Sequence, residues 1–342
     1  MKLFFLTRNY ARCLSSICGG FLGSFIFYIA LDIFTRKSFI LKTLDINYRQ
    51  RPECICSRPK LPQLSSHILL NEKQPSFCSL YSSQRGPHQR IISISLSGPN
   101  GVQKFEIHRT LNYLKLLIKD VHTIYSDGYI LRVYHDDKIN ATDIICPIEC
   151  EHSNVDFCNM QNKMFIPPDI WRFIPAGDPL VDIMISRNLE SALTKRERAA
   201  VNAWLASKKS FHVMRDHPTH KMRMLAGMWG FRPSLNRSLS RLILNKIHNR
   251  ELIKQYTDRA DQLFLSSHVW PFATSSLLIH DSFYCMSKLG HKTEPFPTQR
   301  PSANATNCYV GCTRTCCGHG KLPFGPCPKQ CRPKNHPEWT YC

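Results

Sequence analysis

Charged and amide side chains follow directly after a short apolar run in the middle of the chain. Residues 181–185 are mostly apolar and are bounded by polar residues, which is typical of a buried strand in a parallel sheet. Arg187, Asn188 and Glu190 come next, and open α/β sheets bind ligands at the carboxyl ends of such strands. A carboxylate there can hold Mn²⁺ or Mg²⁺ through hard oxygen ligands, and the cation can bridge a diphosphate. The segment therefore predicts a diphosphate site, with Arg187 and Asn188 as ligand contacts and Glu190 as a metal ligand.

A second polar cluster lies between Arg215 and His220. Arg215 is suited to neutralising diphosphate charge, and Asp216 or His217 to accepting a proton from an attacking hydroxyl. The same residues also suit a loop of hydrogen-bonded structural side chains, and this alternative stays open. A zinc hydrolase site built from His217 and His220 is disfavoured, because Pro218 opposes the helical spacing that such sites need.

Strand and helix patterns alternate around these clusters. Residues 91–96 predict a strand that runs into the glycine turn 97–101, which suits the approach of a nucleotide and equally suits a plain turn. Apolar residues at helical spacing predict a helix over 113–125, and residues 129–134 predict the next strand. This order indicates a right-handed βαβ unit and an α/β fold.

The later elements are predicted from shorter signals. Residues 167–173 fit a short helix with an aromatic face, and residues 211–214 fit another strand. Thr194 and Glu197 fit a capping box, which predicts that a helix begins there. These elements continue the alternation of the α/β fold.

The cysteines and glycosylation motifs point to an oxidising compartment. Fourteen of the sixteen cysteines lie beyond residue 31, and Asn140, Asn236 and Asn304 each begin a glycosylation motif. Together they predict a lumenal protein with disulfides, including disulfides at Cys146, Cys150 and Cys158 rather than a metal site. The tail carries seven cysteines, at positions 308, 312, 316, 317, 327, 331 and 342. Seven cysteines cannot all pair with one another, so one must bond elsewhere, and Cys285 is the nearest candidate. Zinc binding by these cysteines is an alternative, which the oxidising conditions of the lumen disfavour.

An apolar segment near the N-terminus predicts a membrane anchor. Residues 13–31 carry no charge and are long enough to cross a bilayer as a helix. A cleaved signal peptide is the alternative, although the apolar run is longer than the usual signal core. Basic residues flank this segment on both sides, so charge does not decide its orientation in the membrane. The cysteines and glycosylation motifs, which predict a lumenal location for the rest of the chain, decide it instead. We expect a type II protein of the Golgi or endoplasmic reticulum membrane, or otherwise a secreted one. The expected parts are a cytosolic tail (1–12), an anchor (13–34), a stem (35–90), a catalytic body (91–300) and a disulfide-rich tail (301–342).

The net charge and its distribution indicate which kinds of ligand the protein can bind. The net charge is +20, yet no run of basic residues interleaved with aromatics and no zinc-finger or helix-turn-helix signature is present. A lumenal location also argues against nucleic acid. Scattered basic charge suits nucleotide diphosphates, acidic glycans or a membrane surface.

From residue 91 to about 296 the chain resembles a largely uncharacterised bacterial and invertebrate family of glycosyltransferases with the GT-A fold. The resemblance is carried by the order of its motifs. They are Trp171-Arg172-Phe173, the strand at 181–185, Ala199-Ala-Val-Asn-Ala-Trp-Leu205, Phe211-His-Val-Met-Arg-Asp-His-Pro218, Gly227-Met-Trp-Gly230, Asp261-Gln262 and His280-Asp-Ser-Phe283. It implies a Rossmann-like mixed sheet flanked by helices.

The resemblance also implies roles for single residues. Arg172, Arg215 and Gln262 would bind the donor together with Arg187 and Asn188. Asp261 would be catalytic together with Asp216 and His217, in a position that faces both substrates. His280 would complete a metal site with Glu190.

One motif departs from the family pattern. The family strand ends in Arg-Asp-x-Asp-Ser-Arg, whereas this chain has Arg187-Asn-Leu-Glu-Ser-Ala192. Asn188 keeps an oxygen but loses a charge, and Glu190 reaches one methylene further. The sequence thus predicts a glycosyltransferase that uses a nucleotide-sugar donor, Mn²⁺ or Mg²⁺, and a lumenal glycan or glycoprotein acceptor. The alternative is a catalytically inactive relative that binds or scaffolds glycans.

Overall fold

A computed structural model describes residues 54, 56, 58, 59, 61, 78–97, 104–257, 259–285, 289, 291–300, 309–314 and 325–342. The chain divides into two units, residues 1–51 and 52–342, and all of the described residues belong to the second. The predicted anchor, the glycine turn beyond residue 97 and the Asn304 motif lie outside this part. Within it, no helix has both the length and the apolar character needed to cross a membrane.

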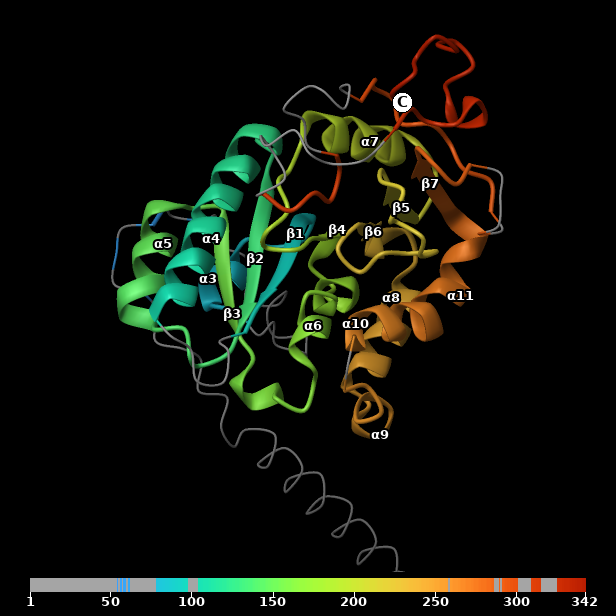
Figure 1. Ribbon diagram of the computed structural model, residues 1–342. Coiled ribbons are helices and arrows are strands. Elements are labelled where there is room, and N and C mark those ends of the chain that lie inside the picture. The colour runs from blue at the N-terminus through green and yellow to red at the C-terminus, as the bar shows by residue number, and fades with distance from the viewer. Residues whose placement is uncertain are drawn as a thin grey trace, which may run out of the picture. The chain divides into compact units, whose positions relative to one another are not determined.

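A mixed sheet forms the centre of the described body (Figure 1). In the described residues its strand order is β3-β2-β1-β4-β6-β5-β7. Strand β6 runs antiparallel to its neighbours, and the other strands are mutually parallel. The strands are β1 Gln89–Leu96, β2 Tyr129–His135, β3 Val155–Asn159, β4 Val181–Ser186, β5 Phe211–Arg215, β6 Trp229–Phe231 and β7 Leu277–Asp281.

Helices cover both faces of the sheet (Figure 1). The described ones are α3 Leu80–Gln84, α4 Lys104–Ile124, α5 Cys146–Glu151, α6 Pro168–Trp171, α7 Lys195–Ala206, α8 Arg237–His248, α9 Arg250–Ile253, α10 Ala260–Phe264 and α11 Trp270–Ala273. Strand β1 shows why there are two apolar layers. Ile91 packs with residues of α6, α8 and α10, whereas Ile92 packs with residues of α4 and α7, because successive side chains of a strand point to opposite faces.

The βαβ unit predicted from the sequence is confirmed. Strands β1 and β2 pair in parallel, with Arg90 opposite Tyr129, and α4 connects them. The helix begins at Lys104, nine residues before the predicted start at 113, since the apolar residues among 104–112 do not follow the regular helical spacing seen later. The strands predicted at 181–185 and 211–214 are present as β4 and β5.

Disulfides join the N-terminal part of the body to the outer edge of the sheet. The bonds are Cys54–Cys146, Cys56–Cys150 and Cys78–Cys158. They confirm the disulfides predicted for the segment 143–159. The predicted stem is therefore attached to the body from Cys54 onward, and α3 within it caps its first turn with the Ser79 hydroxyl.

The C-terminal tail is also held by disulfides. Cys285 bonds to Cys331, which confirms the predicted link out of the tail, and Cys327 bonds to Cys342. Cys312 is disulfide-bonded as well. These bonds fix the tail close to the end of β7, at the edge where the predicted site residues lie.

Candidate functional site

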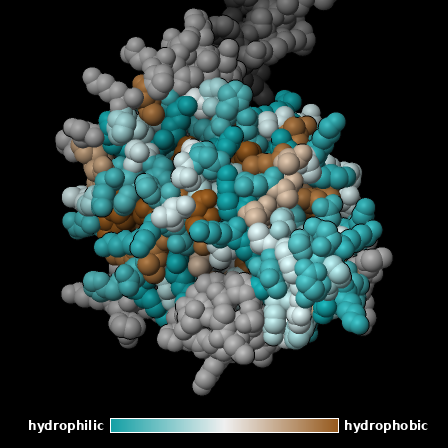
Figure 2. Space-filling view, turned by 90° about the horizontal axis from the view of Figure 1, so that it is seen from above, coloured by the Kyte–Doolittle hydropathy of each residue, from teal (hydrophilic) through white to brown (hydrophobic). Residues whose placement is uncertain are grey.

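The carboxyl ends of the parallel strands meet along one edge of the sheet. Strands β1 and β4 are neighbours there, while the chain continues from β1 toward β2 on one side and from β4 toward β6 on the other. Such a reversal of strand order is where open α/β sheets bind ligands. Figure 2 shows the molecule from above the view of Figure 1, with a mainly hydrophilic face and hydrophobic residues in small patches.

Arg172 lies at this reversal point, directly after α6. Its backbone N–H donates to the Ser95 hydroxyl of β1 at 3.1 Å. Its Nη1 donates to the Arg187 carbonyl at 3.2 Å and to the Asn188 side-chain oxygen, and its Nη2 donates to the Asp261 carboxylate. The structure thus brings three of the predicted residues, Arg172, Asn188 and Asp261, into one partly exposed group.

Gln262 and Gly227 complete the surroundings of this group. The Gln262 side-chain nitrogen donates to the Met224 carbonyl at 2.6 Å, and its oxygen accepts from the Ala226 N–H at 3.2 Å. Gln262 therefore fixes the segment before β6 rather than presenting its amide to a ligand. Gly227 follows, where a Cβ atom would lie 2.5 Å from the Asn188 oxygen. The backbone can approach Asn188 this closely only because residue 227 has no side chain.

Arg187 points away from the group, into the layer under α7. Its Nε donates to the Glu197 carboxylate at 2.7 Å, and the Tyr125 hydroxyl donates to the same oxygen at 2.9 Å. This corrects the prediction that Arg187 contacts the donor, because the guanidinium is buried and already paired. It also corrects half of the capping box: Thr194 accepts from the Glu197 N–H, as predicted, but the Glu197 side chain is taken up by Arg187.

The two predicted metal ligands do not come together. Glu190 is exposed after β4, whereas His280 is buried on β7, with β6 and β5 between the two strands. His280 Nδ1 lies 2.8 Å from His212 Nε2. Burial and the charge of Arg196 lower the pKa of His280 to about 3. Within the described residues, no group of three or more His, Cys, Asp or Glu side chains is arranged to hold a metal. Glu190 and His280 therefore do not form one metal site in the described part of the chain.

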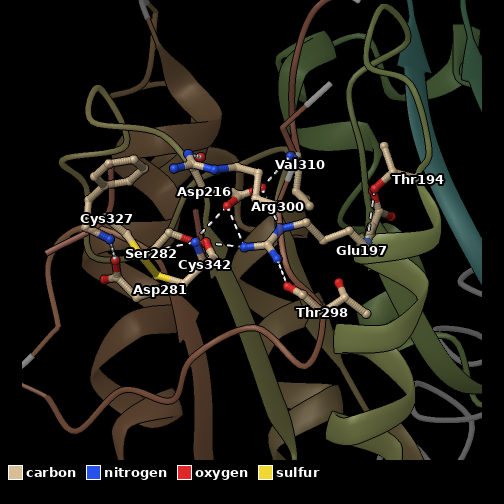
Figure 3. A network of polar contacts seen from close by, with 12 residues as sticks. Thr194, Glu197, Asp216, Asp281, Ser282, Thr298, Arg300, Val310, Cys327 and Cys342 are labelled. Carbon is tan, nitrogen blue, oxygen red and sulfur yellow. Dashed lines mark hydrogen bonds and ion pairs between the residues drawn. A yellow bond between two sulfur atoms is a disulfide. The ribbon is translucent and has the colours of Figure 1, made fainter. Parts of the chain in front are cut away.

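Asp216 is the centre of a buried network (Figure 3). Arg196 donates to both of its carboxylate oxygens, each at 3.0 Å. The carboxylate of Asp216 also accepts from the Ser282 hydroxyl at 2.7 Å and from the Val310 N–H at 3.0 Å, and its backbone carbonyl accepts from Arg300 at 3.2 Å.

These contacts give Asp216 a structural role instead of the predicted role as base. Burial alone would raise the pKa of Asp216, but Arg196 holds it below its usual range. A carboxylate in this state is a weak proton acceptor. It joins β5, α7, the end of β7 and the tail, because its partners come from each of them.

Arg215 and His217 flank Asp216 and have different surroundings. Arg215 is buried and pairs with Asp281 at 2.6 Å, so the charge expected for a diphosphate is already compensated. His217 stacks on Tyr309, with ring centroids 4.3 Å apart, and its Nδ1 lies 2.7 Å from the Thr219 hydroxyl. Burial, with the charge of Arg300, lowers the pKa of His217, so its imidazole is neutral at pH 7.

Sequence reasoning did not find Arg196, Arg300 and Tyr309 as parts of this edge, and it gave Ser282 no role beyond its place in the motif at 280–283. Arg300 and Tyr309 come from a part of the chain more than 80 residues after Asp216, and no local pattern links them to it. Arg196 lies in the first turn of an expected helix, where a basic residue interacts unfavourably with the helix dipole. This unfavourable position could have indicated that Arg196 has a specific acidic partner.

Comparisons with protein-family models and with curated proteins give no match. Among solved structures, an active-site mutant of LgtC is similar over 56% of this chain and 73% of its own, with a TM-score of 0.36 and 11% identity. A 4-diphosphocytidyl-2C-methyl-D-erythritol synthase from Anaerococcus prevotii is similar over 57% of this chain and 87% of its own, with a TM-score of 0.36 and 12% identity. Neither likeness is strong enough to carry an argument about the chemistry, which rests on the contacts above.

Proposed function

We propose that the chain is a glycosyltransferase that moves a sugar from a nucleoside diphosphate donor to a lumenal glycan or glycoprotein. The observation that carries the proposal is the group formed by Arg172, Asn188 and Asp261 where the strand order reverses. Unlike the buried pair of Arg215 and Asp281, the pair of Arg172 and Asp261 is partly exposed, so a donor diphosphate can replace Asp261 at Arg172. The released carboxylate is then a proton acceptor, and the Asn188 amide is a partner for a sugar hydroxyl. The family resemblance of the sequence supports the same reading.

Each member of the group has a distinct role in this proposal. Arg172 binds the donor diphosphate and compensates the charge that grows on it as the bond to the sugar breaks. Asn188 orients a hydroxyl of the ribose or sugar. The acceptor oxygen forms a bond to the anomeric carbon, the diphosphate leaves with the electron pair, and Asp261 takes the hydroxyl proton. His217 is the second candidate base, because it is neutral at pH 7.

Dependence on Mn²⁺ or Mg²⁺ remains a prediction, with Glu190, an exposed carboxylate two residues after Asn188, as the ligand. The alternative function is a catalytically silent protein that binds or scaffolds glycans. Asn188, in a position where the family carries a carboxylate, favours this alternative.

Donor turnover by the full-length protein in detergent separates the two functions. We expect hydrolysis of a nucleotide sugar to be lost in Asp261→Asn and retained in Asp182→Asn, which alters a partly exposed carboxylate at the opposite edge of the sheet. Calorimetry of donor binding, with Mn²⁺ or with a chelator, then tests the metal. Donor binding without turnover would favour the silent protein. Unchanged binding with chelator and in Glu190→Ala would remove the metal from the proposal.

Location in a Golgi-type membrane is part of the same proposal. Asn140 and Asn236 are both exposed, and each accepts backbone hydrogen bonds at a helix start through its side-chain oxygen. Retention of the protein in membranes after an alkaline carbonate wash, with a mass decrease on endoglycosidase treatment, is the expected result. A soluble product whose N-terminus lies beyond residue 31 would establish the secreted alternative.

A further inference from the structure

A basic loop leaves the end of β5 and borders the candidate site. We call residues 217–223, with the sequence His-Pro-Thr-His-Lys-Met-Arg, the rim loop. It contains no Asp or Glu. Lys221, Met222 and Arg223 are exposed, Met222 at 42%. The chain then passes through Met224 and Ala226, which Gln262 holds, to Gly227 beside Asn188. The rim loop is thus joined to the Arg172 group by a short, fixed segment.

The rim loop is held firmly at its base. The Asp216 N–H donates to His220 Nδ1 at 3.0 Å, and the Tyr284 hydroxyl donates to the Pro218 carbonyl. Arg215 reaches the Arg223 carbonyl at 3.4 Å. The exposed side chains therefore project from an ordered backbone, so a ligand that binds them does not have to order the loop first.

An aromatic surface lies against the first residues of the rim loop. Tyr309, from the tail, stacks on His217 and lies 5.6 Å from the His220 ring, measured between centroids. Tyr309 is partly exposed. A partly exposed ring next to hydrogen-bonding groups offers an amphipathic surface, apolar on its face and polar at its rim. Sugars have matching apolar C–H faces and polar edges.

The positive charge of the rim loop is not cancelled by the carboxylates around its ends. Asp216 is paired with Arg196, Asp281 with Arg215, and Asp261 with Arg172. In the described part of the chain, neither Lys221 nor Arg223 forms an ion pair with an acidic side chain; Arg223 lies 6.0 Å from the Trp270 ring centroid. Two exposed cations thus remain on a loop whose first residues contact an aromatic ring.

We infer that the rim loop docks an acidic glycan, with Lys221 and Arg223 contacting its carboxylate or sulfate groups and Tyr309 contacting a sugar face. The inference rests on the proposed function to the extent that a glycan bound here, next to Asn188 and Asp261, is the acceptor. Docking itself requires only the rim loop and Tyr309, not the Arg172 group. Cationic side chains on a fixed backbone select for anionic groups, because a neutral sugar leaves the like charges uncompensated.

The test is calorimetric titration of the full-length protein in detergent with three hexasaccharides: a hyaluronan fragment, a heparin fragment and a neutral chitin fragment. We expect an acidic hexasaccharide to bind and the neutral one not to. The double variant Lys221→Ala/Arg223→Ala should weaken binding roughly 2- to 30-fold, the sum of two surface charge contacts. The matched control is Lys208→Ala/Lys209→Ala, which removes two exposed lysines at the opposite end of β5.

Three outcomes would overturn the inference: equal binding of the neutral hexasaccharide, no loss in the rim-loop variant, or equal loss in both double variants, which would indicate net charge alone. Unchanged melting temperatures are expected in both variants, because the altered side chains are exposed. Donor titration of the same samples separates this inference from the proposed function. Donor binding without glycan binding rejects the docking surface alone, whereas loop-dependent glycan binding without donor binding rejects the transferase and leaves the docking surface in place.

Discussion

Arg172 and Asp261, 89 residues apart in the sequence, form an ion pair that also includes the amide oxygen of Asn188. The pair is only partly covered, with side-chain exposures of 10% and 14%. One guanidinium therefore links α6, the end of β4 and α10 at the point where the strand order reverses. An anionic ligand that reaches this point would meet a cation whose position is already fixed.

Replacing Arg172 by lysine should disrupt donor binding. Lysine keeps the charge but cannot reach a carboxylate, an amide oxygen and a carbonyl at the same time. We expect nucleoside diphosphate affinity to fall roughly 10- to 100-fold, the value of charge-assisted hydrogen bonds, as measured by calorimetry. Arg237→Lys, which alters a comparable arginine bound to Asp182, serves as the control and should leave affinity unchanged. Equal affinity in both variants would argue against a donor site at Arg172.

A methyl group at residue 227 should displace Asn188. The added Cβ of Gly227→Ala would lie 2.5 Å from the Asn188 oxygen and 2.8 Å from its nitrogen, so the amide must move. Donor affinity should fall while the melting temperature changes little, since Asn188 is exposed. Gly325→Ala, where an added Cβ meets nothing within 4 Å, is the matched control. A donor that binds Gly227→Ala normally would show that Asn188 is not one of its contacts.

Asp216→Asn should lower the stability of the fold, and any loss of turnover should follow from that. The change removes the charge partner of Arg196 inside the network of Figure 3, and breaking a buried pair costs about 3–5 kcal/mol. A large drop in melting temperature is expected. Replacing both partners, as Arg196→Met/Asp216→Leu, should be less harmful, because Arg196 is then not left as a buried charge without its partner. If Asp216→Asn instead kept its melting temperature and lost turnover, Asp216 would act in catalysis.

Acid should destabilise the fold through the buried pair of His212 and His280. Both have lowered pKa values in the folded state, that of His280 to about 3, because of burial. The unfolded chain binds more protons below pH about 6.5, so stability is complete above that pH and is lost as the pH falls toward 3. His280 alone contributes about 2 kcal/mol of loss between pH 7.5 and pH 5. In His280→Gln, the difference in melting temperature between these two pH values should shrink, whereas the exposed-residue control His108→Gln should behave as the wild type.

The backbone of this fold is largely readable from the sequence, because its signals are local. Strand β4 and the βαβ unit follow from apolar runs and helical spacing within about 45 residues. The disulfide partners are not readable, since Cys54 and Cys146 are 92 residues apart and cysteine spacing does not determine connectivity.

The candidate site is readable in its residue types but not in the direction of its side chains. Arg187 and Asn188 are adjacent, yet only Asn188 faces the group with Arg172, whereas Arg187 is drawn to Glu197 under α7. The partner that each side chain contacts depends on where the helices pack against the sheet, and a sequence pattern does not predict that position. The same reason explains why Asp216 looks reactive in the sequence and is fully paired in the structure.

The disulfide between Cys54 and Cys146 has a consequence for biosynthesis. Because the ribosome releases the chain from its N-terminus, Cys54 waits for 92 further residues before its partner exists. At ordinary elongation rates of about 5–20 residues per second, this interval lasts roughly 5–20 s. During that time Cys56 and Cys78 also lack their partners, so early oxidation among these three thiols would produce wrong bonds that must be exchanged. The yield of folded protein should therefore depend on thiol–disulfide exchange catalysts in the compartment where the chain is made.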